Sequence, residues 1–275
     1  MRWQLATGAD RDGYWQGHIA GASFVDLDTE LAAQPGSAGR HPLPQAEQFA
    51  ADMRSAGVRN DRPVVVYDTA NATAAARAWW LLCYFRHPQV AVLDGGLAAW
   101  ARAGLPLTTD APTARVGDFV PRPGGMPVLD AAGAGELAAR GILLDAREPE
   151  RFHGLSEPID PVAGHIPGAR NLPTSGNVTE SGRFLERDEL RSGFERAGVS
   201  DGLEVGAYCG SGITAAHEVL ALELAGFRAS LYPGSWSEWI TDPSRPVARD
   251  SEGVSARARA ASAVTRGARR APRSR

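Results

Sequence analysis

Short apolar segments alternate with longer stretches of helical periodicity through both halves of the chain. Residues 64–68 and 141–147 are short apolar runs that end in a polar residue, which predicts buried strands. A third apolar run, 203–208, precedes residues 214–224, where apolar residues recur at helical spacing and stop at Gly226. Strands that alternate with helices predict an α/β fold, with a mostly parallel sheet in each half and helices on both of its faces.

Three landmarks occur twice, in the same order, along the chain. The first is Gly-His-Ile-Ala-Gly-Ala, which returns as Gly-His-Ile-Pro-Gly-Ala; the second is a strand, and the third is a segment that contains glycine and tryptophan. The matching pairs are 17–22 with 164–169, 64–68 with 205–209, and 93–100 with 231–239. Ordered landmarks at similar offsets predict a tandem duplication of one domain and not a solenoid.

A stretch rich in proline, glycine and arginine separates the two copies and predicts an interdomain linker at 109–125. The domains are therefore expected at 1–108 and 126–243. In the second copy a whole strand precedes the Gly-His-Ile motif, whereas in the first copy Met1 already stands at the end of the corresponding strand. We expect the native chain to begin upstream, so that the first domain is truncated at its N-terminus and has an open apolar slot beside its sheet.

Composition and charge narrow the class of protein. A length of 275 residues fits two domains, and 43% hydrophobic with 22% charged residues is typical of a soluble globular protein. Two cysteines cannot form a disulfide framework, which favours a reducing compartment such as the cytoplasm. No run reaches the roughly 18 apolar residues of a membrane span, and no signal peptide is evident as written. A cytoplasmic monomer without a membrane partner is therefore expected.

The arginine residues are concentrated at the C-terminus. All 29 basic residues are arginine, and nine of them lie between Arg245 and Arg275, where Asp250 and Glu252 are the only acids. The composition of residues 244–275 offers too little apolar surface to offset the entropy of ordering, so we expect a disordered tail. Such a tail raises nucleic-acid binding as an alternative, but the remaining body is acidic and disfavours it.

Cys209 is the strongest candidate for chemistry. It ends an apolar strand and opens the loop Cys-Gly-Ser-Gly, which leads into the N-terminus of a helix. Inward-pointing amides and the positive end of the helix dipole favour a thiolate at such a position. The other cysteine, Cys83, lies in an apolar run and is expected to pack in the core.

Taken together, these motifs resemble those of the two-domain rhodanese sulfurtransferases, the family of 3-mercaptopyruvate and thiosulfate sulfurtransferases. The resemblance rests on the two Gly-His-Ile motifs, on Asp145-Ala146-Arg147 and on the Cys-Gly-Ser-Gly-Ile-Thr loop, and it spans roughly residues 1–243. It implies two rhodanese-like domains, the first catalytically inactive because Asp68 stands where its duplicate has Cys209. It also implies a persulfide on that cysteine, with no cofactor and no metal.

The resemblance assigns further roles. In the mercaptopyruvate branch the loop serine forms a proton relay with a histidine and an aspartate of the inactive half, here Ser211, His41 and Asp28. The arginine that holds the anionic group of the donor corresponds to Arg151. Backbone amides that would bind the persulfide belong to Gly210, Gly212, Ile213 and Thr214. From the residues alone, Asp28 could equally be a turn residue and His41 a loop histidine with a structural partner.

The sequence motifs leave the identity of the sulfur donor open. The segment 157–163 lacks the second carboxylate-binding arginine of the mercaptopyruvate branch, and Gly210-Ser211 replaces the Arg-Lys pair of the thiosulfate branch. We favour 3-mercaptopyruvate, because a serine suits a donor whose thiol proton must move. Cyanide, a small thiol or a thioredoxin-like protein would accept the sulfur. A phosphatase is disfavoured by Ala215, which stands where phosphate would need an arginine, and a non-catalytic sulfur carrier or binding module is disfavoured by the intact loop.

Overall fold

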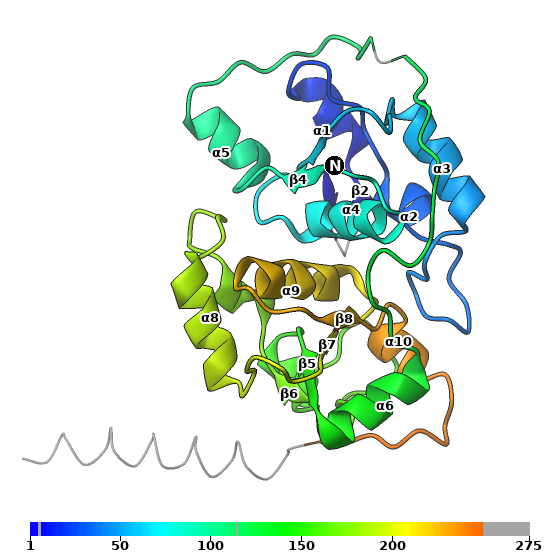
Figure 1. Cartoon of the computed structure of the whole chain (residues 1–275), viewed down its shortest axis with the longest axis vertical. Coiled ribbons are helices and arrows are strands. Elements are labelled where there is room, and N and C mark those ends of the chain that lie inside the picture. The colour runs from blue at the N-terminus through cyan, green and yellow to red at the C-terminus, as the bar shows by residue number, and fades with distance from the viewer. Residues whose placement is uncertain (5–6, 114, 250–275) are drawn as a thin grey trace, which may run out of the picture.

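The structure, a computed structural model, describes residues 1–4, 7–113 and 115–249 and contains two α/β domains packed on each other (Figure 1). The first domain comprises β1 (Trp3–Gln4), β2 (Gly8–Ala9), α1 (Arg11–Gln16), α2 (Leu27–Glu30), α3 (Ala46–Ser55), β3 (Val64–Val66), α4 (Thr73–Tyr84), β4 (Val90–Val92) and α5 (Gly96–Arg102). The second comprises α6 (Ala131–Arg140), β5 (Ile142–Asp145), α7 (Pro149–Phe152), β6 (Arg170–Asn171), the 3-10 helix η1 (Thr174–Asn177), α8 (Arg187–Arg196), β7 (Val205–Tyr208), α9 (Ile213–Leu224), β8 (Ser230–Leu231) and α10 (Ser235–Trp239).

The second domain has a four-stranded parallel sheet in the order β6-β5-β7-β8. Every residue of β5 and β7 is buried, which explains why both segments are apolar along their whole length. Successive side chains of β5 point to opposite faces: Ile142 and Leu144 join the core formed with α8 and α9, and Leu143 joins the core formed with α6 and α10. Helices on both faces of a parallel sheet confirm the predicted α/β fold.

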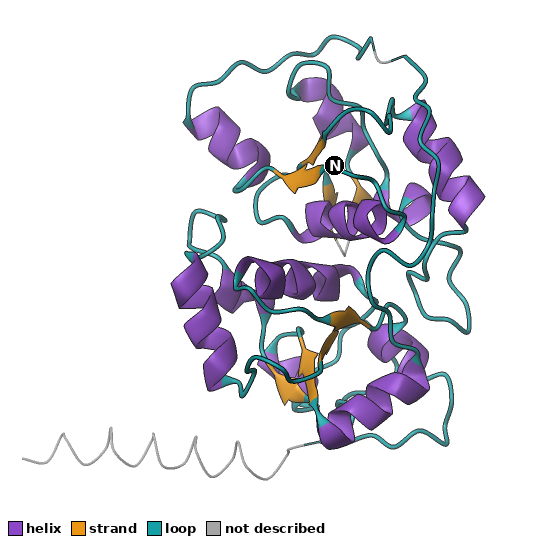
Figure 2. Ribbon diagram, viewed as in Figure 1, coloured by secondary structure: helices purple, strands orange, loops and turns teal. Residues whose placement is uncertain are grey.

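The first domain has a much smaller sheet. Its β3 pairs in parallel with β4, and β1 forms a separate antiparallel pair with β2. Figure 2 shows the short strands of this domain in the upper half of the picture and the larger sheet of the second domain in the lower half, with helices between them. The edge of β3 away from β4 is open within the described residues, and Val65 on it is 60% exposed. The apolar slot expected beside this sheet is present.

The two domains share one core. Helices α4 and α9 lie side by side at the junction (Figure 1), and a single hydrophobic cluster continues through it from one domain to the other. Arg77 of α4 crosses this junction and donates to the carbonyl of Gly212, the residue that precedes α9. The catalytic loop expected after β7 therefore lies at the N-terminus of a helix that faces the other domain.

The segments that follow each domain pack on its surface. In the predicted linker, the Gly117 amide donates to the Arg54 carbonyl (2.8 Å) and the Gly125 amide to the Tyr84 carbonyl (2.7 Å), so this part lies along the first domain.

At the C-terminus the structure differs from the expected tail, which was to begin at 244. Ala248 exchanges two backbone hydrogen bonds with His165 (2.9 and 3.0 Å), and the Arg249 guanidinium donates to the Ala163 carbonyl (2.9 Å). Residues 245–249 thus extend along the second domain, held by an isolated bridge that composition does not reveal. The rest of the predicted tail, 250–275, lies outside the described residues. Within those residues no helix combines the length and the apolar character that a bilayer crossing requires.

Candidate active site

A cavity of about 750 Å³ between the two domains contains the Cys209 loop. Its walls come from both halves, since Thr69, Asn71 and Arg102 of the first domain face Cys209 and Thr214 of the second. The predicted site residues gather here: Cys209, Gly210, Ser211, Ile213, Thr214 and Arg151 line the cavity, Gly212 contributes an amide, and His41 and Asp28 lie behind Ser211.

The thiol of Cys209 is held by its own loop. It directly follows β7 and is 2% exposed, and the Gly212 amide donates to its sulfur at 3.2 Å. Gly212 has a φ of 80°, and a side chain there would place Cβ 2.3 Å from the Pro233 carbonyl oxygen. Only glycine permits this turn, which aims the amide at the sulfur and starts α9 one residue later.

The duplicate loop of the first domain shows what such a loop binds. Asp68 occupies the position of Cys209, and its carboxylate accepts four backbone hydrogen bonds of 3.0 to 3.2 Å, from the amides of Ala70, Ala72, Ala74 and Ala75. This carboxylate satisfies the backbone amides of the loop and of the first turn of α4. The same backbone arrangement in the second domain is therefore suited to a thiolate or a persulfide anion.

A chain of hydrogen bonds runs from the loop into the first domain. The Ser211 hydroxyl lies 2.8 Å from His41 Nδ1, and His41 Nε2 lies 3.3 Å from Asp28 Oδ1. The Trp3 indole donates to the same oxygen of Asp28 at 2.9 Å and fixes its orientation. These contacts join residues 170 positions apart, and they support the relay implied by the resemblance over the alternative of two isolated loop residues.

His41 is neutral at pH 7. Burial, followed by the positive charge of Arg77, lowers the pKa of its imidazole to about 4, and this effect outweighs the nearby Asp28 carboxylate. The contact with Asp28 is therefore a hydrogen bond of a neutral ring and not an ion pair. If Nε2–H donates to Asp28, Nδ1 is left with a lone pair that accepts the Ser211 hydroxyl proton.

A cluster of two arginines and two acids lies on the other side of Gly210. Arg151 contacts Glu157 at 2.7 Å and Asp160 at 2.9 Å, and Arg40 of the first domain reaches the other oxygen of Asp160 at 2.6 Å. The two guanidiniums lie 3.1 and 3.5 Å from the point where a Cβ of Gly210 would stand. Two nitrogens of Arg40, Nε and Nη2, are buried and have no hydrogen-bond partner within the described residues.

Arg40 was missed because the resemblance places the second donor-binding arginine before Gly164, where this sequence has none. The structure brings the guanidinium of Arg40 to the cavity that contains Cys209, where it pairs with Asp160, 120 residues away in the chain. A signal was present in the sequence, since Arg40 directly precedes His41. This adjacency alone does not predict a shared site, because the side chains of adjacent loop residues need not point in the same direction.

Arg77 was missed as well. It lies on α4, is fully buried, and donates to the carbonyl oxygens of His41 (3.0 Å) and Gly212 (3.4 Å). Burial lowers the pKa of its guanidinium to about 10, so it keeps its charge at neutral pH, and Cys209 is the group that favours that charge. Arg77 thus connects the relay histidine to the Cys209 loop and places a cation near the sulfur.

Arg147 and Cys83 have contacts that do not suggest a part in a reaction at Cys209. Arg147 forms a buried ion pair with Asp145 at 2.7 Å and donates to the Gly164 carbonyl, so its contacts hold the second domain together. Burial raises the pKa of the Cys83 thiol to about 12, so this cysteine stays protonated. In the described ranges no three histidine, cysteine, aspartate or glutamate side chains gather in a way that could hold a metal ion.

The sequence profile of the rhodanese-like domain matches the chain twice, at residues 8–103 and at residues 129–242. The two matches coincide with the two halves of the duplication, and the second contains the Cys209 loop. The chain belongs to the rhodanese-like family. Both the predicted family and the predicted pair of rhodanese-like domains are thereby confirmed.

Several members of the rhodanese-like family are similar over most of their length. A Pseudomonas aeruginosa protein named as a 3-mercaptopyruvate sulfurtransferase is 49% identical over 244 residues, which cover 86% of this chain and 85% of the relative. A Mycobacterium tuberculosis protein named as thiosulfate sulfurtransferase SseB is 45% identical over 260 residues, covering 90% and 89%. The crystal structure of SseA from Escherichia coli, described under 3-mercaptopyruvate sulfotransferases, matches with a TM-score of 0.75 and 35% identity over 86% of this chain and 92% of that one.

Proposed function

We propose that this protein is a sulfurtransferase that moves sulfane sulfur from 3-mercaptopyruvate to a thiol or to cyanide through a persulfide on Cys209. In this proposal residues 126–243 form the catalytic domain, and residues 1–108 form an inactive domain that completes the site. The observation that carries the proposal is the row of side-chain contacts from Ser211 through His41 to Asp28. It lies beside the Cys209 sulfur, which accepts a hydrogen bond from the Gly212 amide. The proposed setting is the cytoplasm, since both cysteines are free thiols.

In the first half-reaction the Cys209 thiolate attacks the sulfur of mercaptopyruvate. The new S–S bond forms as the carbon–sulfur bond breaks, and the electron pair of that bond goes to carbon and gives the enolate of pyruvate. The proton of the donor thiol passes to the Ser211 oxygen, while the Ser211 proton passes to His41 Nδ1, and the relay then returns a proton to the enolate carbon. The products are pyruvate and the persulfide anion, which the Gly212 amide stabilises.

In the second half-reaction a nucleophile takes the outer sulfur. A thiolate or cyanide attacks the terminal atom of the persulfide, the S–S bond breaks, and the Cys209 thiolate leaves with the electron pair. Because Cys209 is 2% exposed in its resting form, the acceptor has to enter the cavity between the domains. A small thiol, cyanide or the exposed thiol of a thioredoxin-like protein fits this requirement.

The arginine cluster supports a donor with a carboxylate. Arg40 and Arg151 lie on one side of Gly210, and the free nitrogens of Arg40 can donate to a second anion while its Nη1 stays on Asp160. Arg40 thereby takes the place of the second donor-binding arginine that the sequence lacks before Gly164. The Asp160 carboxylate already pairs with both guanidiniums. It therefore competes with the carboxylate of the donor and should raise the KM for the donor.

The same arginine cluster is also the strongest argument for thiosulfate as the sulfur donor. The loop residues themselves offer no cation, but two guanidiniums within about 3.5 Å of the Cβ position of Gly210 could hold a compact dianion there. With thiosulfate, Cys209 would attack the outer sulfur and sulfite would leave, and no proton would need to move. The two donors therefore differ in whether the Ser211–His41 contact matters.

The test is kcat/KM for both donors, with cyanide as acceptor, on wild type and on Ser211→Ala. We expect the serine variant to lose mercaptopyruvate turnover by a factor on the order of 10² while thiosulfate turnover changes little. Ser192→Ala, at an exposed position on α8, is the matched control and should behave as wild type. A tenfold preference of wild type for thiosulfate, or unchanged mercaptopyruvate turnover in Ser211→Ala, would refute the donor assignment.

A further inference from the structure

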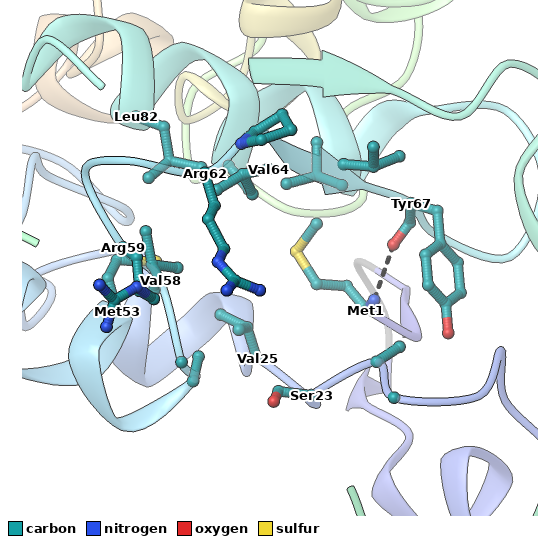
Figure 3. Close-up of a pocket in the computed structure, with 18 residues that line it drawn as sticks. Met1, Ser23, Val25, Met53, Val58, Arg59, Arg62, Val64, Tyr67 and Leu82 are labelled. Carbon is teal, nitrogen blue, oxygen red and sulfur yellow. Dashed lines mark hydrogen bonds between the residues drawn. The ribbon is translucent and has the colours of Figure 1, made fainter. Parts of the chain in front are cut away.

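The cavity between the domains differs from the slot beside β3 in the charge of its wall. The slot has a mainly apolar lining, which includes Val25, Val64 and Leu82 (Figure 3). In the interdomain cavity, by contrast, Arg40 and Arg151 form part of the wall, and both contact buried acids. The affinity of this cavity for an anion therefore depends on the balance between its arginines and these acids.

The arginines and acids on the Gly210 side of the cavity form one connected cluster with a formal charge of zero. Its members within the described residues are three guanidiniums and three carboxylates: Arg40, Arg147, Arg151, Asp145, Glu157 and Asp160. At most 3% of each of the three acidic side chains is exposed. Because every acid contacts a guanidinium, the cluster presents little net positive charge to a ligand.

Asp160 is the acid that Arg40 and Arg151 share. Its Oδ1 lies 2.6 Å from Arg40 Nη1, and its Oδ2 lies 2.9 Å from Arg151 Nη2. Arg40 Nη2 is buried without a hydrogen-bond partner within the described residues, and it lies 3.1 Å from the point where a Cβ of Gly210 would stand. One guanidinium thus contacts an internal acid and also borders the space beside Gly210. An anion in that space is attracted by Arg40 and repelled by Asp160.

A cluster without net charge distinguishes anions by their charge. The attraction between an ion and a fixed set of charges is proportional to the charge of the ion, whereas the free energy needed to remove the ion from water grows with the square of that charge. A dianion therefore has a desolvation penalty roughly four times that of a monoanion of the same size. The Arg40 nitrogens can offset the smaller penalty, but a neutral cluster does not offset the larger one.

We propose that the cluster beside Gly210 binds singly charged anions in preference to dianions, and that Asp160 is the residue that sets this preference. The inference deepens the proposed function and rests on it for the identity of the donor: mercaptopyruvate carries one negative charge on its carboxylate, whereas thiosulfate is a dianion. Asp160 is then a specificity-determining residue. It weakens the binding of both donors, and it weakens that of thiosulfate more.

The experiment compares two tetrahedral anions of similar size and different charge, methanesulfonate and sulfate. Neither carries a transferable sulfur, and each should slow the alkylation of Cys209 by neutral iodoacetamide when it occupies the cluster. Peptide mass spectrometry separates this reaction from that of Cys83. Wild type should bind methanesulfonate several-fold more tightly than sulfate, because only the dianion has the larger desolvation penalty.

The variant Asp160→Asn removes one negative charge and keeps the size of the side chain. Since the electrostatic free energy is proportional to the charge of the ligand, the gain in affinity for a dianion is the square of that for a monoanion. We expect about a fivefold gain for methanesulfonate and about a 25-fold gain for sulfate. Asp160→Glu retains the charge and should keep the wild-type order of the two anions. Asp188→Asn removes a charge at an exposed position on α8 and should match wild type for both.

The proposal is overturned if wild type binds sulfate at least as tightly as methanesulfonate, a comparison that needs no variant. Equal gains for the two anions in Asp160→Asn would overturn it as well. The kcat/KM values of the donors test the link to the proposed function: in Asp160→Asn the ratio of thiosulfate to mercaptopyruvate should rise about fivefold. If the two anions respond as expected and this ratio stays constant, the anion site is confirmed, and the use of the cluster by the donor is refuted.

Discussion

Replacement of Glu218 by glutamine tests the electrostatics of the interior of the second domain. Glu218 lies in the middle of α9 with no exposed surface, and Asn177 donates to its Oε2 at 2.6 Å. Burial raises the pKa of its carboxyl from 4.5 to about 8, so the native protein holds this group neutral at pH 7. Glutamine keeps the acceptor for Asn177 and removes the titration.

The sign and size of the effect follow from the two pKa values. Below pH 4.5 both the native and the unfolded state hold the proton, and no stability is lost. Between pH 4.5 and 8 only the unfolded state releases it, so native stability falls by about 1.4 kcal/mol per pH unit and then levels off. The penalty is about 1 kcal/mol at pH 5 and about 3 kcal/mol at pH 7. Glu218→Gln is free of it at every pH.

The assay is urea unfolding of wild type and Glu218→Gln at pH 5, 6, 7 and 8. The amide itself shifts stability by an amount that does not depend on pH, so the informative quantity is the change in the difference between the two proteins. We expect the variant to gain about 2 to 3 kcal/mol on wild type between pH 5 and pH 7. Glu189→Gln, exposed on α8, is the matched control and should give parallel curves. Parallel curves for Glu218→Gln would refute the neutral carboxyl.

Three further predictions concern the active site. Cys209→Ser should abolish sulfur transfer and also the mass gain of one sulfur that donor treatment gives the wild type. Cys83→Ser replaces a thiol whose pKa is about 12, so its activity should stay within a few-fold of wild type. A mass gain of one sulfur in Cys209→Ser would contradict the assignment. Arg40→Ala should raise KM for mercaptopyruvate roughly tenfold at constant kcat, and an unchanged KM would remove Arg40 from the donor pocket. Arg77→Met should lower kcat by a factor on the order of 10², because it frees both the His41 carbonyl and the Cys209 loop; stopped-flow kinetics that show wild-type persulfide formation would count against this role.

Local patterns in the sequence were sufficient to predict the second domain and the loop that carries Cys209. The strand that ends at Tyr208, the glycine turn and the helix from Ile213 are consecutive along the chain, so periodicity and turn chemistry predict them together. The same holds for β5, whose apolar run matches its burial on both faces. The juxtaposition of Ser211 with His41 came from the resemblance, since nothing local connects two residues 170 positions apart.

The site residues that the sequence did not reveal depend on contacts between the domains. Arg77 looks like an ordinary helix residue in an alanine-rich stretch, and only the approach of α9 to α4 makes it a link between His41 and Gly212. Arg40 is visible as a loop arginine, but its role follows from the position of Asp160 in the other domain. At the C-terminus, the bridge between Ala248 and His165 shortens the tail that composition alone predicted.

The duplication has led to a division of labour between the copies. In the first copy Asp68 stands at the position of Cys209, and its carboxylate accepts hydrogen bonds from four backbone amides of the loop. The same copy places His41, Arg40 and Arg77 in contact with the second domain around the Cys209 loop. In the proposed mechanism neither copy is a complete enzyme, so activity depends on how the two copies pack on each other. A substitution far from Cys209 that moves the two copies apart by about 1 Å should therefore lower the rate of the proposed transfer on the order of 10²-fold, although the thiol itself is intact.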